Sequence, residues 1–152
     1  MWPPSTAKPT SARSSTPRRP PQYRIWRSPD GKQKLRFHYC IQEKQFRRFF
    51  TMAKKSKGNT GNTLMQLLEC RLDNVVRRMG VGRTIWATRQ IVAHGHTIVD
   101  GVRTDIASYL VKPGQTITFR EGIHKLLREN MEQGAGHNVP GWIEFNPAQL
   151  TA

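Results

Sequence analysis

The stretch TRQIVAHGHTIVDG, residues 88–101, marks the point where a helical pattern of apolar residues gives way to a strand-like one. Gly95 stands where the helical pattern stops, and glycine most often adopts the left-handed conformation that ends a helix. The following residues alternate between apolar and polar, and the Asp100–Gly101 pair accepts the positive φ angles of a type I′ turn. The stretch therefore predicts a helix that leads directly into an antiparallel β-hairpin.

Helical and strand patterns continue on both sides of this stretch. Residues 63–80, TLMQLLECRLDNVVRRMG, predict one long helix that ends at Gly80, and Thr84 is placed to cap a shorter helix that forms a hairpin with it. Residues 112–115 predict a turn, residues 116–119 a last strand and residues 122–132 a weak helix. The irregular end is expected to be anchored by Trp142 and Ile143. The apolar stripe of the long helix consists of Leu64, Leu67, Leu68, Leu72, Val75, Val76 and Met79.

A second helical region precedes this domain, with a break near Tyr39 and Cys40. In EKQFRRFFTMAKKSK, residues 43–57, the apolar residues fall on one face at helical spacing and basic residues cover the rest. The acid in this helix is Glu43 alone, so pairs at i,i+4 cannot balance the charge. We interpret the basic residues as a phosphate-facing surface rather than an ordinary solvated face. They are Arg47, Arg48, Lys54 and Lys55.

The charge of the chain indicates a polyanionic partner, with nucleic acid as the first candidate. The 152 residues include 25 Lys and Arg against 10 Asp and Glu, a net charge of +15. Residues 1–61 hold 15 basic and 2 acidic side chains, whereas residues 62–152 hold 10 and 8. No run of 18 apolar residues predicts a membrane span. Cys40 and Cys70 form no CxxC pair, which argues against a disulfide framework or closed zinc site and favours a reducing compartment.

Residues 1–29 contain seven prolines, five serines and six basic residues without an acid. Such a segment buries too little apolar surface to offset the entropy of ordering, so we expect a disordered basic tail. An organellar transit peptide is the alternative, although seven prolines oppose the amphipathic helix that such peptides form.

The histidines do not predict a metal or catalytic site. Zinc needs three or four ligands at fixed spacing, but His94 and His96 straddle a glycine and His38, His124 and His137 are scattered. No motif for an activated nucleophile is present. The two histidines either pack at the joint or contribute to an RNA-binding cluster, because RNA is recognised largely by shape through its phosphates and 2′-hydroxyls. The cluster comprises Arg71, Arg77, Arg78, Arg83, Arg89, Gln90, His94, His96 and Lys112.

The sequence resembles a known family over roughly residues 32–121. LMQLLECRLDNVVRRMG (64–80) and TRQIVAHGHTIVDGVRTDIASYLVKPGQTITFRE (88–121) resemble the RNA-binding domain of small-subunit ribosomal protein S4. KQKLRFHYCIQEKQFRRFFTMAKKSKGNTG (32–61) resembles the helical region before that domain. The resemblance implies direct binding to 16S-type rRNA early in subunit assembly and contact with neighbouring small-subunit proteins. It implies a cytoplasmic ribosome, or an organellar one if residues 1–29 are a transit peptide.

The resemblance also implies an α+β fold with an αL-type RNA-binding domain, a helix hairpin packed on a small antiparallel sheet. That domain is expected at residues 62–121, after the tail at 1–29 and a basic helical region at 30–61, on which residues 122–152 are a candidate to pack. Relative to the family, the chain is expected to be shortened at both ends. Arg77 departs from a usual aromatic, Cys40 from a usual glycine, and Ile85–Trp86 from the common Arg-Ala or Ile-Pro pairs.

The expected RNA contacts combine the cluster, the basic helix and positions carried over from the resemblance. They are Arg71, Asn74, Arg77, Arg78, Arg83, Thr84, Arg89, Gln90, His94, His96, Arg103, Ser108, Lys112, Arg47, Arg48, Lys54 and Lys55. Structural roles are expected for Asp73, which would restrain neighbouring arginines, and for Gly80, Gly95, Asp100, Gly101 and Tyr109. No enzyme activity, cofactor, metal, membrane or small-molecule substrate is expected. The alternative function is a stand-alone RNA-binding factor that uses the same domain in stalled-ribosome handling or translational regulation.

Overall fold

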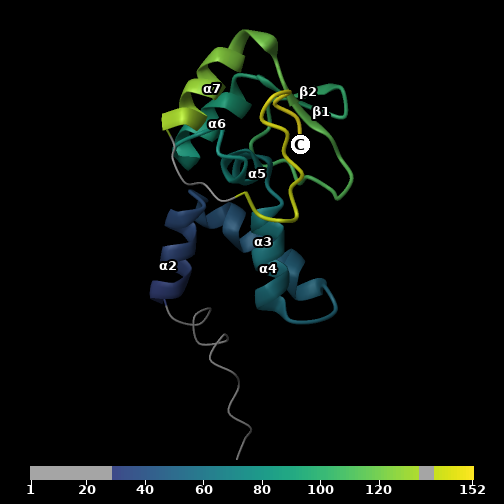
Figure 1. Cartoon of the computed structure of the whole chain (residues 1–152). Coiled ribbons are helices and arrows are strands. Elements are labelled where there is room, and N and C mark those ends of the chain that lie inside the picture. Colours follow the sequence, from purple (N-terminus) through teal and green to yellow (C-terminus); the bar gives the residue numbers. More distant parts are fainter. Residues whose placement is uncertain (1–28, 134–138) are drawn as a thin grey trace, which may run out of the picture.

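The computed structural model describes residues 29–133 and 139–152, so the tail expected at 1–29 lies outside them except for Pro29 (Figure 1). None of the helices in these two ranges is long and apolar enough to cross a membrane. The elements are α2 (Pro29–His38), α3 (Glu43–Lys55), α4 (Thr60–Glu69), α5 (Leu72–Arg78), α6 (Ile85–Ala93), β1 (Thr97–Val99), β2 (Val102–Thr104), β3 (Ile117–Phe119), the 3₁₀ helix η1 (Glu121–Ile123) and α7 (His124–Gln133).

The described residues bury their apolar side chains in two separate clusters. The first cluster joins α3 and α4 to the end of α2, and its buried residues are Tyr39, Ile41, Phe46, Phe49, Ala53, Leu64 and Leu68. The second joins α5, α6, the sheet and α7, and includes Val76, Val92, Phe119, Leu127 and Leu150. Figure 1 shows the first group of helices below the second. The predicted α+β fold, a helix hairpin packed on a small antiparallel sheet with a helical region before it, is confirmed.

The single long helix predicted for residues 63–80 is wrong, because the chain leaves the helical conformation between α4 and α5. Arg71 is extended, with φ −70° and ψ 138°. Its backbone neighbours pair with a distant segment: the Leu72 N–H donates to the Tyr109 carbonyl at 2.8 Å, and the Val111 N–H donates to the Cys70 carbonyl at 2.8 Å. Each of these hydrogen bonds replaces one that a continuous helix would have made.

This break also moves the boundary between the two regions. The sequence interpretation placed it between residues 61 and 62, at the start of α4. However, Leu64 and Leu68 of α4 pack in the first cluster, whereas Leu72 and Val76 of α5 pack in the second. The apolar residues between Leu64 and Met79, which look like one continuous helical stripe in the sequence, therefore pack in two different cores. The boundary between the two regions lies at Cys70–Arg71.

The hairpin of α5 and α6 packs on a three-stranded antiparallel sheet in the order β2-β1-β3. Thr84 caps α6 by accepting a hydrogen bond from the Ala87 N–H at 3.2 Å. In the sheet, Ile98 stands opposite Arg103 of β2 and Thr118 of β3. Asp100 and Gly101 have φ angles of 49° and 81°, as a type I′ turn requires. The strands and turn predicted from residues 96–105 are present.

The C-terminal part packs on the second cluster and not on residues 30–61, which corrects the packing suggested for residues 122–152. Ile123, Leu127 and Leu150 are buried among the side chains of α5, α6 and the sheet. Ala152 pairs with Ile117, and the two exchange backbone hydrogen bonds of 2.6 and 3.0 Å at the free edge of β3. Trp142 was expected to anchor this end, but its side chain is exposed and Leu150 is the buried anchor.

Cys40 adopts a backbone conformation that costs an L-residue energy, and it generates a stability prediction. Its φ angle is 48°, in the left-handed region. Side-chain crowding there costs roughly 1–2 kcal/mol, part of which the greater freedom of glycine in the unfolded chain offsets. Cys40→Gly should raise the free energy of unfolding by about 0.5–1 kcal/mol, measured by urea denaturation. Cys70→Gly is the control, because Cys70 has a φ of −72°. A loss of stability in both variants would contradict the prediction.

Candidate nucleic-acid interface

The basic residues of the described chain divide into those that bond within the protein and those that face outward. Asp73, fully buried, is the centre of the first set. The Arg71 guanidinium donates to both Asp73 carboxylate oxygens, at 3.0 and 2.5 Å, and is itself fully buried. It lies over the ring of Phe49, 5.6 Å from the centroid, so a cation from the α4–α5 junction also contacts the first cluster.

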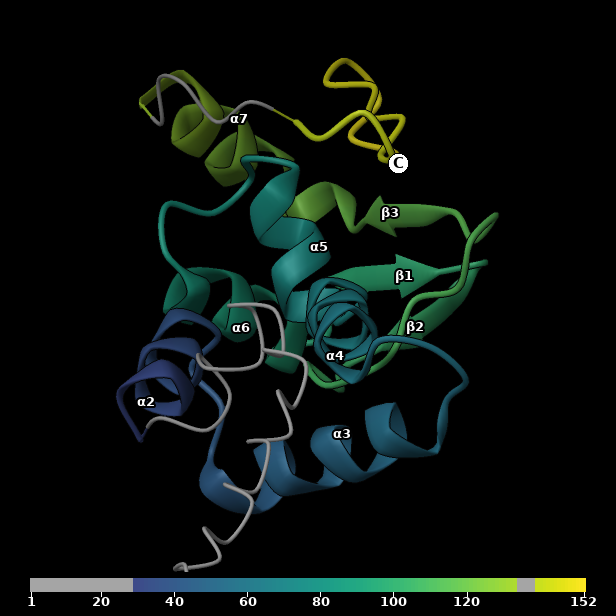
Figure 2. The same ribbon diagram turned by 90° about the horizontal axis from the view of Figure 1, so that it is seen from below.

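Arg89 of α6 completes this network. Its Nη2 lies 3.4 Å from the second Asp73 oxygen, and its Nη1 donates to the Cys40 carbonyl at 2.8 Å. The Arg89 side chain therefore connects α6, which packs in the second cluster, to the loop between α2 and α3. In Figure 1 the upper end of α2 lies below α6, and Figure 2 shows the same two helices seen from below.

Glu69, the last residue of α4, centres a second network. Its carboxylate accepts hydrogen bonds from the Tyr39 hydroxyl at 2.7 Å, from Asn74 Nδ2 at 2.5 Å, and from Arg78 Nε and Nη2 at 3.1 and 2.6 Å. Burial by itself would raise the pKa of Glu69, but the hydrogen bonds from Arg78, Tyr39 and Asn74 outweigh it and lower that pKa. Glu69 therefore stays ionised and holds Arg78 in place.

Outward-facing cations lie on several elements. On α3 the exposed side chains are Arg47, Arg48, Lys54 and Lys55, of which Arg47 bonds to Glu43 at 3.0 Å. Of the RNA contacts predicted between residues 83 and 112, the exposed ones are Arg83, Thr84, Gln90, His94, Arg103 and Lys112. Arg77, His96 and Ser108 are half-buried. The pKa of His38, at the end of α2, is lowered mainly by burial of its ring. The positive charges of Arg77 and Arg78, at the end of α5, lower it further.

The joint between α6 and β1 depends on Gly95, whose φ is 68°. A Cβ atom there would collide with the guanidinium of Arg103, which crosses the glycine and lies 3.4 Å from the His94 carbonyl oxygen. The rings of His94 and His96 are 6.0 Å apart and tilted by 48°. Within the described ranges no three His, Cys, Asp or Glu side chains gather as metal ligands would. The joint presents an arginine and two imidazoles on one surface.

Two turns are tied together at the far end of the sheet. Asp100 accepts a hydrogen bond from the Thr116 N–H at 2.8 Å and another from Gln115 Nε2 at 2.6 Å. The side-chain oxygen Oε1 of Gln115 accepts a hydrogen bond from the Lys112 N–H at 2.8 Å. Gln115 therefore fixes the backbone from which the Lys112 side chain extends.

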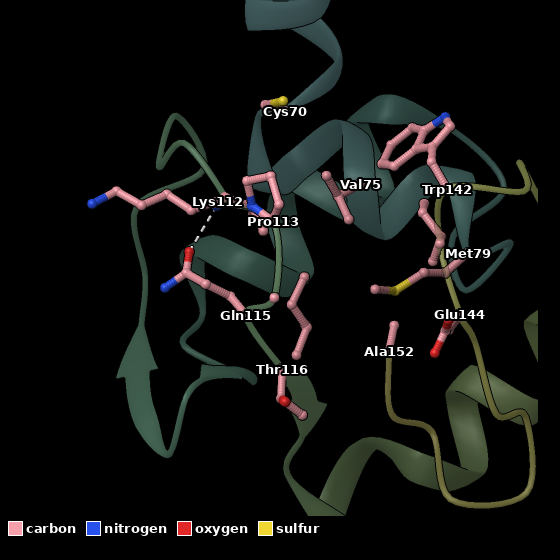
Figure 3. Close-up of a pocket in the computed structure, with 14 residues that line it drawn as sticks. Cys70, Val75, Met79, Lys112, Pro113, Gln115, Thr116, Trp142, Glu144 and Ala152 are labelled. Carbon is pink, nitrogen blue, oxygen red and sulfur yellow. Dashed lines mark hydrogen bonds between the residues drawn. The ribbon is translucent and has the colours of Figure 1, made fainter.

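A half-open pocket of about 540 Å³ lies between α5, this turn and the C-terminal segment. Figure 3 shows Lys112 and Gln115 on one side of it and Met79, Trp142 and Glu144 on the other. The Lys112 side chain points away from the pocket, and Glu144 brings an acid to its opposite wall. The pocket is thus distinct from the basic surface.

Comparison with known proteins agrees with this arrangement. The model of the ribosomal protein S4/S9 N-terminal domain matches residues 12–69, and the model of the S4 domain matches residues 70–117. The small ribosomal subunit protein uS4 of Bacillus cytotoxicus is 51% identical over 123 residues, which are 80% of this chain and 60% of that protein. The proteins of the same name from Bordetella avium and Aquifex aeolicus are each 48% identical, over 79% and 76% of this chain and 59% and 56% of their own lengths.

The chain belongs to the uS4 family. It spans about three fifths of the length of these relatives. The two matched uS4 regions meet at residues 69 and 70, where α4 ends and the chain passes into the extended Arg71. The observed break in packing thus coincides with the family's own division.

Several uS4 residues that the sequence assigned to RNA do not face outward. Arg71 and Asn74 are fully buried, so their side chains lie away from the surface, and their contact with RNA stays a prediction. Arg78 and Arg89 use their guanidinium groups in the two internal networks. For the exposed residues, RNA contact stays a prediction.

Sequence reasoning missed Glu69, Tyr39 and Gln115 as positioning residues. A signal for Glu69 was available: between Glu43 and Asp100 the acids are Glu69 and Asp73 alone, within a segment rich in arginine. Isolated acids in such a segment indicate internal pairing. Tyr39 and Gln115 gave no comparable signal, because their partners lie 30 and 15 residues away in the sequence.

The Asp73 network predicts that Arg71 acts on stability. Arg71→Ala should lower the free energy of unfolding by about 3–5 kcal/mol, because it leaves a buried carboxylate without its closest cation. Denaturant unfolding measures this. The exposed Arg83→Ala is the control and should change stability by less than about 0.5 kcal/mol. If Arg71→Ala matched the control in stability while weakening RNA binding, Arg71 would be an RNA contact after all.

The Glu69 network predicts a pH dependence. Because the pKa of Glu69 is lower in the folded protein than its ordinary value of 4.5, its stabilising contribution is complete above about that pH. The contribution is lost as the pH falls through the lower, folded-state pKa. Unfolding measured from pH 7 down to pH 3 should therefore show a smaller acid-induced loss in Glu69→Gln than in the unsubstituted chain. Glu129→Gln, an exposed substitution on α7, serves as the control, and equal pH profiles for the two variants would contradict the prediction.

Proposed function

We propose that the protein is a structural constituent of the small ribosomal subunit that binds 16S-type rRNA directly and helps nucleate subunit assembly. The observation that carries this proposal is the similarity to relatives named small ribosomal subunit protein uS4 across both packing units. Its partners are small-subunit rRNA and neighbouring small-subunit proteins, on cytoplasmic ribosomes. No turnover, cofactor or small-molecule substrate belongs to this role.

The distribution of charge supports a phosphate-binding surface. Lys44, Arg47, Arg48, Lys54 and Lys55 extend from the exposed faces of α3, and the acid in that helix is Glu43 alone. From Asn74 to Val99 the sequence contains no acid. Cations without acidic neighbours repel one another in the free protein, and a polyanion relieves that repulsion while releasing its counterions.

The networks around Asp73 and Glu69 give this surface a fixed shape. Arg89 holds α6 to the loop before α3, and Arg71 holds the α4–α5 junction to Phe49 of α3. The basic face of α3 and the α6–β1 joint are therefore carried on one connected frame. Such a frame suits a folded RNA, whose recognition depends on the spacing of phosphates.

Sedimentation tests the ribosomal role against that of a stand-alone RNA-binding factor. Tagged protein should co-sediment with small subunits after a wash in high salt, because a protein incorporated during assembly is enclosed by RNA and by neighbouring proteins. A factor that binds from outside should be released by the same wash. Release from subunits combined with retained affinity for free rRNA would support the alternative function.

Salt dependence of binding tests the α3 surface. Lys54 and Lys55 are exposed, and the described residues provide no ion-pair partner for either. The double substitution Lys54→Ala with Lys55→Ala should flatten the plot of log K against log salt for a small-subunit rRNA transcript. The slope should change by roughly 0.7–0.9 for each phosphate that the variant no longer neutralises.

Lys125→Ala is the matched control, because Lys125 is exposed on α7, at the opposite end of the molecule from α3 in Figure 1. It should leave the slope nearly unchanged. Equal effects of the α3 and α7 substitutions would indicate diffuse electrostatic attraction without a defined surface on α3.

A further inference from the structure

Trp86 is an aromatic side chain that the fold leaves outside both cores. It lies in the first turn of α6 and is 65% exposed. The apolar residues that α6 does bury are Ile85, Ile91 and Val92. An indole carries a large apolar surface, so leaving it in water forgoes a contribution that burial would give. Nothing in the packing of α6 accounts for a tryptophan at this position.

The neighbours of Trp86 on the helix surface are polar or basic. Gln90 follows Trp86 by four residues and shares its face of α6, while Arg83 precedes the N-cap Thr84 and His94 caps the other end of the helix. The side chains of Arg83, Gln90 and His94 are exposed. Arg89 also belongs to α6, but its guanidinium is turned inward to Cys40 and Asp73. The exposed surface of α6 and of its two ends therefore carries an aromatic ring, a cation, an amide and an imidazole.

The sequence segments that form α6 and most of α2 contain no acid, whereas α7, which bonds to Val81 through Asn130, carries Glu129 and Glu132. No acid occurs between Asp73 and Asp100, and none between Asp30 and Glu43, the segment that contains most of α2. In Figure 1 the upper end of α2 lies below α6. Phe37, in the last turn of α2, is a second exposed aromatic residue near Cys40, to which Arg89 connects. The exposed aromatic residues and the exposed Arg83 fit an anionic partner that has aromatic faces of its own.

Trp142 provides a contrast. It is 57% exposed, yet it borders an apolar pocket together with Glu144, whose carboxylate would repel a phosphate (Figure 3). A protein partner would favour a site of that kind, with contiguous apolar side chains around the aromatic residue. The polar and basic side chains around Trp86 favour RNA as the partner instead.

We propose that Trp86 stacks on an unpaired nucleobase of the bound RNA. In this arrangement Arg83 neutralises an adjacent phosphate, and the Gln90 amide hydrogen-bonds to the edge of the stacked base. Stacking on an aromatic side chain needs a base that is not enclosed in a helix, so the site recognises a loop, bulge or single strand. The inference rests on the proposed function, since it assigns one contact within the rRNA complex.

Affinity measurements on the full chain test the stacking contact. Trp86→Ala should weaken binding to a small-subunit rRNA transcript, and to a single-stranded 12-nucleotide RNA, by roughly 5- to 150-fold, equivalent to about 1–3 kcal/mol. Trp86→Phe should retain most of the affinity because it keeps an aromatic face. Binding to a fully paired duplex should stay unchanged, since the duplex offers no free base. Trp142→Ala is the matched control and should bind all three RNAs normally.

Fluorescence provides a readout that a purely structural role would not alter. The protein has four tryptophans, and replacing Trp2, Trp26 and Trp142 by phenylalanine leaves Trp86 as the reporter. The single-stranded RNA should quench its emission strongly, whereas the duplex should not.

The outcomes separate this inference from the proposed function. If the unsubstituted chain fails to bind the rRNA transcript, the proposed function is wrong. If the chain binds but Trp86→Ala binds equally well, or loses duplex and single-strand affinity alike, the stacking contact is wrong and the proposed function stands. Normal RNA affinity of Trp86→Ala combined with loss of incorporation into subunits would assign Trp86 to a neighbouring protein and would also overturn the inference.

Discussion

The buried carboxylate of Asp73 is the interaction on which the arrangement of the two packing units depends. It binds Arg71 from the α4–α5 junction and Arg89 from α6. Arg71 also contacts Phe49 in the first cluster, and Arg89 also contacts the Cys40 carbonyl. One acid thus fixes two cations, each of which reaches across from the S4 domain to the helical region. A buried ion pair contributes to stability only when its geometry and remaining hydrogen bonds compensate for lost hydration. The two-oxygen contact with Arg71 supplies the geometry, whereas the buried Arg71 Nη1 has no hydrogen-bond partner among the described residues.

This use of arginine reduces the number of cations that the helix hairpin leaves exposed. The number of basic residues in the helix hairpin suggests a dense cationic patch, but Arg71, Arg78 and Arg89 are committed to Asp73 and Glu69. The exposed cations include those on α3, Arg83 before α6, and Arg103 at the α6–β1 joint. The internal networks position this remaining set. Some arginines of this protein therefore bond to buried acids, and others extend into solvent. The presence or absence of an acid beside each arginine determines which of the two it does.

Much of the fold could be predicted from the sequence because its rules are local. Gly95 as a helix end, the Asp100–Gly101 turn and the Thr84 cap each depend on conformational preferences of a few adjacent residues. The break at Arg71 could not, because it depends on hydrogen bonds to Tyr109 and Val111, about 40 residues further along the chain. Local rules also could not predict whether each arginine side chain points into the protein or into solvent. Helical spacing gives the face on which a side chain starts, whereas its final partner depends on which segments pack together.

The contact between Arg89 and Cys40 joins residues 49 positions apart, and it has a consequence for how the protein folds. The loop after α2 reaches its final environment only when α6 has formed, and the carboxylate of Asp73 gains its second cation at the same stage. Non-local closure of this kind couples the ordering of the helical region to that of the S4 domain, despite their separate cores. During synthesis the first helices emerge well before their partner, so the ribosome that translates this chain must release about fifty further residues before the helical region can become fully ordered.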